Sequence, residues 1–313
     1  NSVSISNSNS KPSMNLQSLL ETSENRFTKS LVGEDISNKS QFDCRQVFKA
    51  HYSLCKPERV PLPALVCFSH KCMSDLGLAI SEVNKPEFVE LFSGNTHALG
   101  LNTTDAGWNQ PFAVVYGCHS YAHWFGQLGD GRAVILGDIV VPVQSCSSTG
   151  SGSGGDTGSG SDGGNERAMR YEIQLKGSGR TPFSRWGDGR AVLRSCIREF
   201  LASESMHYLG VPTTRALCVA TTGQGIRRNW YKAHTSSTSD TSIDDAAEIS
   251  RTIMSNRFPP ERPVVEPGAV MTRVAPVSFV RVGQLELFAK RNDFESCKSL
   301  ADYVMDTEYA DEC

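Results

Sequence analysis

The sequence predicts an α+β fold in which an antiparallel sheet is joined by one long helix. Two β-rich runs, residues 132–141 and 170–176, flank a segment made only of Ser, Gly, Thr and Asp, which indicates a hairpin with an expanded tip. A glycine-rich turn, residues 126–132, precedes the first run. Apolar side chains then recur at helical spacing through residues 190–203.

The composition of the 313 residues indicates one domain that carries a terminal tail and two inserts. Residues 1–13 are rich in Ser and Asn and are predicted to be a disordered tail. The domain covers residues 14–305, with a low-complexity insert at 147–164 and a polar insert at about 222–263. Residues 306–313 are interpreted as a truncated end. Long inserts are tolerated in one domain because the entropy of loop closure grows slowly with length.

Shorter elements follow from local patterns. We expect a helix from near Met14, buried structure at 64–69 and a helix at 86–92. Pro267 and Gly268 indicate a turn before a strand to residue 274, and residues 277–282 continue as a further strand. A last helix is expected over 296–305.

The overall charge and the cysteines exclude some classes of protein. A net charge of −3 gives no global field to recruit nucleic acid or an anionic membrane. No apolar run approaches the ~18 residues that a membrane-spanning helix needs. The 10 cysteines form no C-x-x-C pair, which disfavours zinc knuckles, and several lie in apolar runs, which favours a reducing compartment.

Lys176 ends the strand that begins near Tyr171. Side chains alternate across a sheet, so Ile173 and Leu175 share one face while Gln174 and Lys176 share the other. For a single lysine the simpler interpretation is a solvated side chain on an exposed face.

The helix that follows offers Lys176 a partner. We expect Asp188 to cap its N-terminus, and Gly210 with Pro212 to end it. Glu199 lies away from the apolar stripe on a flank of small residues, where a carboxylate could meet Lys176 and hold it toward a phosphate. The alternative is an exposed glutamate on an amphipathic helix.

The glycine turn contains Gly129, Gly131 and Arg132, and glycines let backbone amides face an anion at close range. An ordinary hairpin turn is the competing interpretation, although the strand that follows is typical of the glycine-rich flap of kinases. Five arginines are found nearby, and they are Arg180, Arg185, Arg190, Arg194 and Arg198, of which the last three are four apart and form one basic stripe. These arginines suit either polyphosphate or solvent. Two further arginines, Arg273 and Arg281, interrupt apolar runs on the later strands.

His119 and His123 lie among aromatic residues, which favours a packed turn over a metal site.

Several ordered runs resemble the selenoprotein O/YdiU family. They are FSGN at 92–95, GQLGDGRA at 126–133, QLKGSGRTPFSR at 174–185, GDGRAVLRS at 187–195, IREFL at 197–201, LGVPTTRAL at 209–217 and RVAP at 273–276. The resemblance covers roughly residues 90–305. It implies a protein-kinase-like fold, with an N-terminal lobe and the start of a C-terminal lobe. It also implies transfer of AMP from ATP to the Ser, Thr or Tyr hydroxyls of protein substrates, with Mg as the metal.

By this resemblance the ATP-binding residues are Gly129, Gly131, Arg132, Lys176, Asp188, Gly189, Arg273 and Arg281, and Glu199 supports Lys176 through an ion pair. The family's Gly-His-Gln-Phe-Gly stretch is altered here to residues 117–122, and one residue is added between Arg273 and Arg281.

The resemblance assigns no catalytic residue to this chain. The Asn-Thr-Asp-Asn and Asp-Tyr-Gly segments, which supply the catalytic base and the metal ligands, do not occur in these 313 residues, so the base is expected beyond Cys313. The selenocysteine or cysteine near the C-terminus of some members would lie further on still, and Cys313 is not assigned its role. We therefore expect an inactive fragment of an adenylyltransferase, with a non-catalytic nucleotide-binding or protein-interaction module as the alternative. Family resemblance also suggests a mitochondrial location.

Overall fold

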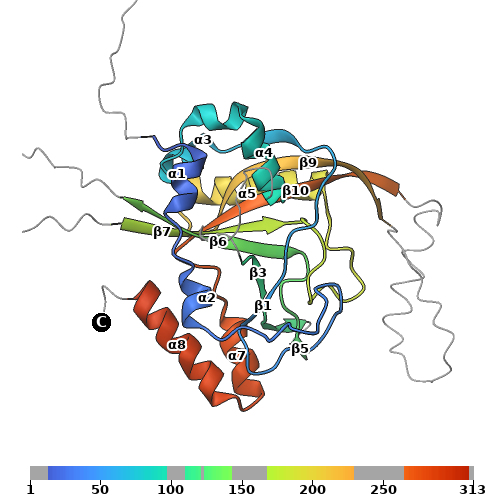
Figure 1. The fold of residues 1–313 in the computed structure, drawn as a ribbon, viewed down its shortest axis with the longest axis vertical. Helices are drawn as coiled ribbons and strands as arrows, with labels where there is room; N and C mark the ends of the chain where they lie inside the picture. Colours follow the sequence, from blue (N-terminus) through green and yellow to red (C-terminus); the bar gives the residue numbers. More distant parts are fainter. Residues whose placement is uncertain (1–12, 97–109, 121–122, 143–167, 229–263, 310–313) are drawn as a thin grey trace, which may run out of the picture.

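The computed structural model describes residues 13–96, 110–120, 123–142, 168–228 and 264–309, and a twisted sheet runs through its centre (Figure 1). The strand order is β1-β3-β6-β7-β10-β9-β2, with the short β8 paired to β10. The strands are β1 Tyr52–Leu54, β2 Ala64–Phe68, β3 Phe112–Val114, β6 Ala133–Pro142, β7 Ala168–Lys176, β8 Ala191–Val192, β9 Arg215–Arg228 and β10 Val264–Pro276. Neighbouring strands in this sheet pair antiparallel, which confirms the mixed α+β class with a mainly antiparallel sheet.

One face of the sheet is covered by the first helices of the chain. These are α1 Leu16–Glu21, α3 His70–Asp75, the 3-10 helix η1 Ile80–Asn84 and α4 Pro86–Ser93. Phe88, Leu91 and Phe92 of α4 are fully buried against this face, as the sequence pattern predicted. On β7 the residues that join this core are Ile173 and Leu175.

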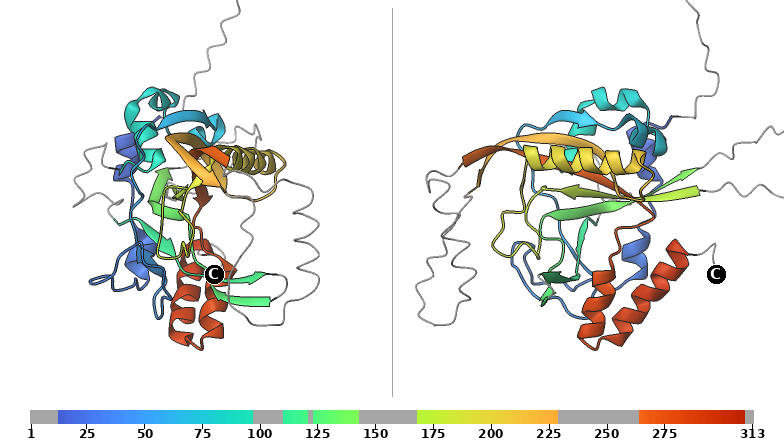
Figure 2. Two further views of the ribbon diagram at one scale, coloured as in Figure 1. Left: turned by 90° about the vertical axis from the view of Figure 1, so that its right-hand side faces the viewer. Right: turned by 180° about the vertical axis from the view of Figure 1, so that it is seen from behind.

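The opposite face is covered by later helices (Figure 2). Helix α5 Leu193–Tyr208 lies over β9 and β10, and its Cys196 packs against Met271. A second apolar cluster joins Phe27 of α2 Arg26–Ser30 to residues of α7 Val282–Lys290 and α8 Phe294–Glu308, and the Phe27 ring packs edge-on against Tyr303. The hairpin β4 Gly117–Ser120 and β5 His123–Gln127 packs on α7. Among the described residues, no helix combines the length and the apolar character needed to cross a bilayer.

Strand β7 confirms the predicted division of side chains, with one difference. Ile173 and Leu175 enter the core under α4, and Gln174 with Lys176 faces the other way. That second face is not open to water. Gln174 is fully buried and Lys176 is only half-buried because α5 and the 279–284 region cover this side.

Four local expectations differ from the structure. Asp188 is not the N-cap of α5, because residues 191–192 first pair with β10 as β8 and the helix begins at Leu193. Pro267 and Gly268 do not form a turn but lie within β10, where the register shifts between Pro267 and Ala269. Arg281 lies on no strand, since it is the N-cap of α7. The polar stretch expected from about residue 222 begins as strand, because β9 continues to Arg228.

The C-terminal part of the described chain is the helix α8. It begins two residues before the expected start at 296 and continues to Glu308, into the segment that was interpreted as a truncated end. The last described residue is Tyr309. Cys313, the position beyond which the sequence analysis expects the catalytic base, therefore lies outside the described residues, and that expectation stays a prediction.

The hairpin around the low-complexity segment is confirmed in its strands. β6 and β7 pair antiparallel from Ala133 and Lys176 out to Pro142 and Ala168. The segment 147–164 itself, the tail at 1–12 and most of the polar stretch lie outside the described residues.

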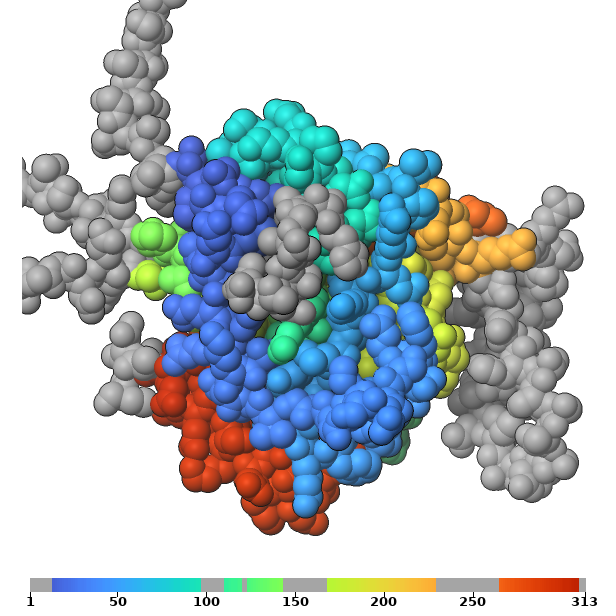
Figure 3. Space-filling view, in the orientation of Figure 1, coloured from blue at the N-terminus to red at the C-terminus, as the bar shows by residue number. Residues whose placement is uncertain are grey.

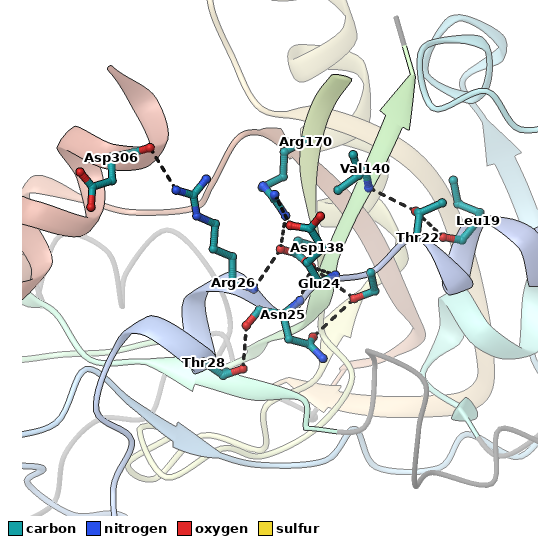
Figure 4. Close-up of polar contacts among 11 residues, drawn as sticks. Leu19, Thr22, Glu24, Asn25, Arg26, Thr28, Asp138, Val140, Arg170 and Asp306 are labelled. Carbon is teal, nitrogen blue, oxygen red and sulfur yellow. Dashed lines mark hydrogen bonds and ion pairs between the residues drawn. The ribbon is translucent and has the colours of Figure 1, made fainter. Parts of the chain in front are cut away.

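A buried carboxylate fixes the N-terminal segment to this hairpin (Figure 4). Asp138 of β6 has a side chain that is only 4% exposed. Its two oxygens accept hydrogen bonds from the Ser23 hydroxyl, from the backbone N–H groups of Glu24, Asn25 and Arg26, and from the Arg170 guanidinium. Arg26, the first residue of α2, also donates to the carbonyl of Asp306 in α8, and the N-terminal part of the chain lies across the face seen in Figure 3.

Candidate functional site

Lys176 and Glu199 form the predicted ion pair between a strand and a helix. The Lys176 ammonium lies 2.8 Å from Oε1 and 2.6 Å from Oε2 of Glu199. The two side chains are 20% and 33% exposed, so solvent reaches the pair only partly. Burial lowers the pKa of Lys176 below its ordinary value, Glu199 opposes this effect, and Arg273 and Arg132 add to it. The charge of Lys176 is therefore held among other cations.

Two arginines, Arg273 and Arg132, lie close enough to Lys176 to lower its pKa, and a third, Arg281, lies near Arg273. Arg273 of β10 lies 5.3 Å over the Phe279 ring, and its pKa is lowered by burial and by Arg281. Arg281 lies 4.6 Å over the Tyr116 ring and forms a 3.1 Å ion pair with Asp130 of the glycine turn. Arg132 has no ion pair among the described residues.

Lys176, Arg132, Arg273 and Arg281 thus face two carboxylates, Asp130 and Glu199, which leaves two positive charges uncompensated there. Cations held together in a partly dry site attract a polyanion.

The glycine turn is packed against residues 181–184 and could not accept side chains. Gly129 has φ +76°, and a Cβ there would lie 2.4 Å from Cγ of Phe183. A Cβ at Gly131 would lie 2.8 Å from the Phe183 carbonyl oxygen. Thr181 and Ser184 donate from their hydroxyls to the carbonyls of Asp130 and Gly131, each at 2.6 Å. Close packing therefore explains both glycines without any ligand.

An open cavity of about 1210 Å³ lies beside this turn. Gly129, Gly131, Arg132, Asp188 and Gly189 all line it, so five of the residues that resemblance assigned to ATP share one wall. Gly189 has φ +67°, and a Cβ there would clash with the Gly179 carbonyl. The cavity also carries Arg185, Arg190, Arg227 and Arg228, and Asp188 is the one carboxylate that lines it within the described part of the chain.

The remaining predicted residues lie elsewhere around the turn. Glu199 and Arg273 line a smaller hollow of about 200 Å³, Lys176 pairs with Glu199, and Arg281 joins the turn to α7. The structure thus brings the predicted set to one region but divides it between a cavity wall and a half-buried cationic cluster.

The arginines singled out in the sequence, including the stripe Arg190, Arg194 and Arg198, have different partners in the structure. Arg190 is paired to Glu58 at 2.8 Å, and Arg194 is paired to Glu266 at 2.5 Å. Arg185 borders the cavity, whereas Arg198 is exposed on α5 and does not line it. Only part of the stripe therefore faces the cavity.

Sequence reasoning missed four residues of this region. Asp130 is buried in the turn, Trp186 borders the cavity, and Arg227 with Arg228 reaches it from the end of β9. Two consecutive arginines after a β-rich run were the available signal, but they stood in a stretch interpreted as a polar insert. Arg228 is held by Asp188, with one contact of 2.6 Å and one of 3.2 Å.

The carboxylates of the site do not form a magnesium site. Asp130, Asp188 and Glu199 are each paired with a cation, and the described residues contain no cluster of three metal-ligating side chains. Mg²⁺ prefers free carboxylate and other oxygen ligands. These residues by themselves fit a phosphate better than a metal.

Fold and site together define an α+β protein in which a strand lysine, braced by a helix glutamate, lies among arginines beside a glycine turn. The family model for the protein adenylyltransferase SelO matches residues 38–239 and 255–313. The chain belongs to this family.

Curated relatives support the assignment. A protein nucleotidyltransferase YdiU from Aromatoleum aromaticum is 40% identical over 286 residues, which is 91% of this chain and 43% of the relative. One from Methylobacillus flagellatus is 36% identical over 290 residues, which is 92% of this chain and 43% of the relative. One from Xylella fastidiosa is 38% identical over 266 residues, which is 85% of this chain and 39% of the relative. The chain thus spans less than half the length of these relatives.

Proposed function

We propose that these residues form the nucleotide-binding part of a protein adenylyltransferase, which transfers AMP from ATP to hydroxyl groups of Ser, Thr or Tyr in proteins. The observation that carries the proposal is the Lys176–Glu199 ion pair within a cluster of surplus positive charge. Family membership supports ATP as the polyanion and proteins as acceptors. A kinase-like fold is part of the same proposal.

The reaction proposed for the whole protein is a substitution at the α-phosphorus. The acceptor oxygen forms a bond to that phosphorus, the bond to the bridging oxygen of pyrophosphate breaks, and pyrophosphate leaves. The acceptor proton goes to a base. In this scheme Lys176, Arg132, Arg273 and Arg281 bind phosphate oxygens, and Glu199 keeps the Lys176 ammonium in place. Fixed positive charges of this kind stabilise the negative charge that develops in the transition state.

By family resemblance the base and the Mg ligands belong to the Asn-Thr-Asp-Asn and Asp-Tyr-Gly segments, which these 313 residues do not contain. In the whole protein those segments would follow Cys313. We accordingly propose that the 313 residues bind ATP without transferring AMP. A mitochondrial location stays a prediction, and the relatives described above are bacterial.

Calorimetric titration with ATP tests the binding step. Lys176→Ala removes a charged hydrogen-bond donor worth about 1.5–3 kcal/mol, so we expect roughly 10- to 150-fold weaker binding. Arg132→Gln serves as a second variant, because it breaks no ion pair among the described residues. Lys298→Ala is the matched control, since its side chain is 76% exposed on α8.

Incubation with ATP labelled on the α-phosphate tests the transfer step. We expect no labelled protein from the 313 residues, and loss of labelling by Lys176→Ala in a chain that includes the two missing segments. Robust self-labelling by the 313 residues would contradict the first expectation. Near-normal labelling by the longer variant would remove Lys176 from the mechanism. ATP binding without transfer by the longer chain would favour a non-catalytic nucleotide-binding module.

A further inference from the structure

Trp186 is the most exposed large apolar side chain that the structure describes, at 88%. It borders the 1210 Å³ cavity rather than a core. A tryptophan contributes most to folding when its large surface is buried. Trp186 makes little such contribution, so its place on the cavity wall calls for another explanation.

The loop that carries Trp186 is fixed to the glycine turn. The hydroxyls of Thr181 and Ser184 hold the start of the loop through the two 2.6 Å hydrogen bonds to the turn. The Gly187 N–H donates to the Ser184 carbonyl at 2.8 Å and closes the loop around Trp186. The indole ring is therefore presented to the cavity by an ordered backbone, which lowers the entropy lost when a ligand binds.

The surroundings of the ring select a ligand with both a planar group and negative charge. The Arg185 guanidinium lies over the ring, 5.1 Å from its centre, and the 88% exposure leaves the other face open. Arg185 itself has φ +53°, a left-handed conformation that is uncommon for arginine and concentrates at functional sites. Arg132 and Arg227 line the same cavity and supply positive charge.

We propose that Trp186 is the stacking platform for the purine base of the bound nucleotide, whose phosphates contact Arg132 in the lining of the same cavity. This inference rests on the proposed function and adds to it a positioning residue for the base. Stacking needs only a π-face, so the contact orients the base without reading its hydrogen-bonding edge.

Calorimetric titration of the 313-residue chain with ATP and with inorganic tripolyphosphate separates the base from the phosphates. Trp186→Ala should weaken ATP binding about 5- to 150-fold, which is the range for loss of one base stack. It should change the affinity for tripolyphosphate less than about twofold. Trp186→Phe keeps an aromatic face and should retain most of the ATP affinity. Tyr208→Ala removes an aromatic side chain that is 71% exposed and does not line the cavity, and it should bind like the wild type.

Thermal melts check that each variant is folded. We expect all of them to fold, because Trp186 and Tyr208 are exposed and contribute little to the core. Equal ATP affinity of the wild type and Trp186→Ala would overturn the inference and leave the proposed function standing. A parallel loss for tripolyphosphate would also overturn it, because the effect would then not involve the base. Absence of binding by the wild type to either ligand would overturn both the proposed function and the inference.

Discussion

Replacement of Asp138 by Asn should destabilise the fold strongly, although the two side chains have nearly the same shape. The carboxylate is buried and accepts three backbone N–H groups from residues 24–26 together with the Arg170 guanidinium. An asparagine keeps one oxygen but places an NH₂ group where the other oxygen was. That group would point a donor at the Arg26 N–H and at Arg170, which now lie 3.1 Å and 2.7 Å from Oδ2.

The magnitude follows from those contacts. Breaking a buried ion pair costs roughly 3–5 kcal/mol, and here the cost falls on the backbone N–H groups of residues 24–26 as well as on Arg170, which keeps its ion pair with Glu24. For a domain of this size each kcal/mol lowers the melting temperature by about 2–4 °C, so we expect a decrease of roughly 6–20 °C. Asp302→Asn is the matched control. Its carboxylate is 57% exposed and pairs with Lys298 at the surface, so its loss should cost at most about 1 kcal/mol.

The effect should also depend on pH. Burial alone would raise the pKa of Asp138, but the N–H groups of residues 24–26 and the Arg170 guanidinium lower it below its ordinary value. A carboxyl group with a lowered pKa stabilises the folded state above its unfolded pKa of about 3.9, and this stability is lost as the pH falls through the folded value. Melts followed by circular dichroism should therefore show a constant difference between wild type and variant near neutral pH, and a shrinking one below about pH 4. A melting temperature within about 2 °C of the wild type at pH 7 would refute this reasoning.

Two further substitutions test the site and the core. Gly129→Ala should lower the free energy of unfolding by about 2–4 kcal/mol and weaken ATP binding, because the new Cβ meets the Phe183 ring at a residue with positive φ. Gly126→Ala is the control. A Cβ at Gly126, which has φ +74°, has no atom within 4 Å, so this variant should lower the free energy of unfolding by only about 1–2 kcal/mol. Equal melting temperatures for these two variants would mean that the Phe183 contact does not require the glycine. Glu172→Gln should remove a pH dependence of stability, because burial raises the pKa of Glu172 to about 8, so the contribution of Glu172 to stability is greatest below about pH 4.5 and is lost as the pH rises toward 8. Between pH 5 and pH 8 the melting temperature of the wild type should therefore fall relative to that of Glu172→Gln. A difference between the two melting temperatures that stays constant over this range would count against a protonated Glu172.

The periodicity of apolar and polar residues predicted the features that depend on a single strand or helix. Alternation in β7 placed Ile173 and Lys176 on opposite faces, and the structure confirms this. The helix spacing placed Glu199 on the flank that meets Lys176. Both predictions need only the geometry of one element and the side chains at its surface.

The features that the sequence did not predict depend on the pairing of strands that lie far apart in the chain. Helix α5 begins at Leu193 because residues 191–192 pair with β10, a strand that starts more than 70 residues later. Leu201, one of the apolar residues in the predicted helical pattern of residues 190–203, is 59% exposed, whereas Cys196 and Glu204 are buried. Burial here follows from the neighbour across the sheet, and single-sequence periodicity does not contain that neighbour.

Charge is likewise determined locally by neighbours in space, which the total over the sequence does not contain. The net charge of −3 indicates no attraction for anions, yet the residues around the glycine turn carry two uncompensated positive charges. Solvent and salt screen charges at the surface far more than charges in a partly buried site, so the local surplus determines what binds there. The surplus also opposes folding, since burial and then the neighbouring cations lower the pKa values of Lys176 and Arg273. A polyanion that enters the site relieves this repulsion and thereby stabilises the fold, which couples nucleotide binding to stability through the residues proposed to bind the phosphates.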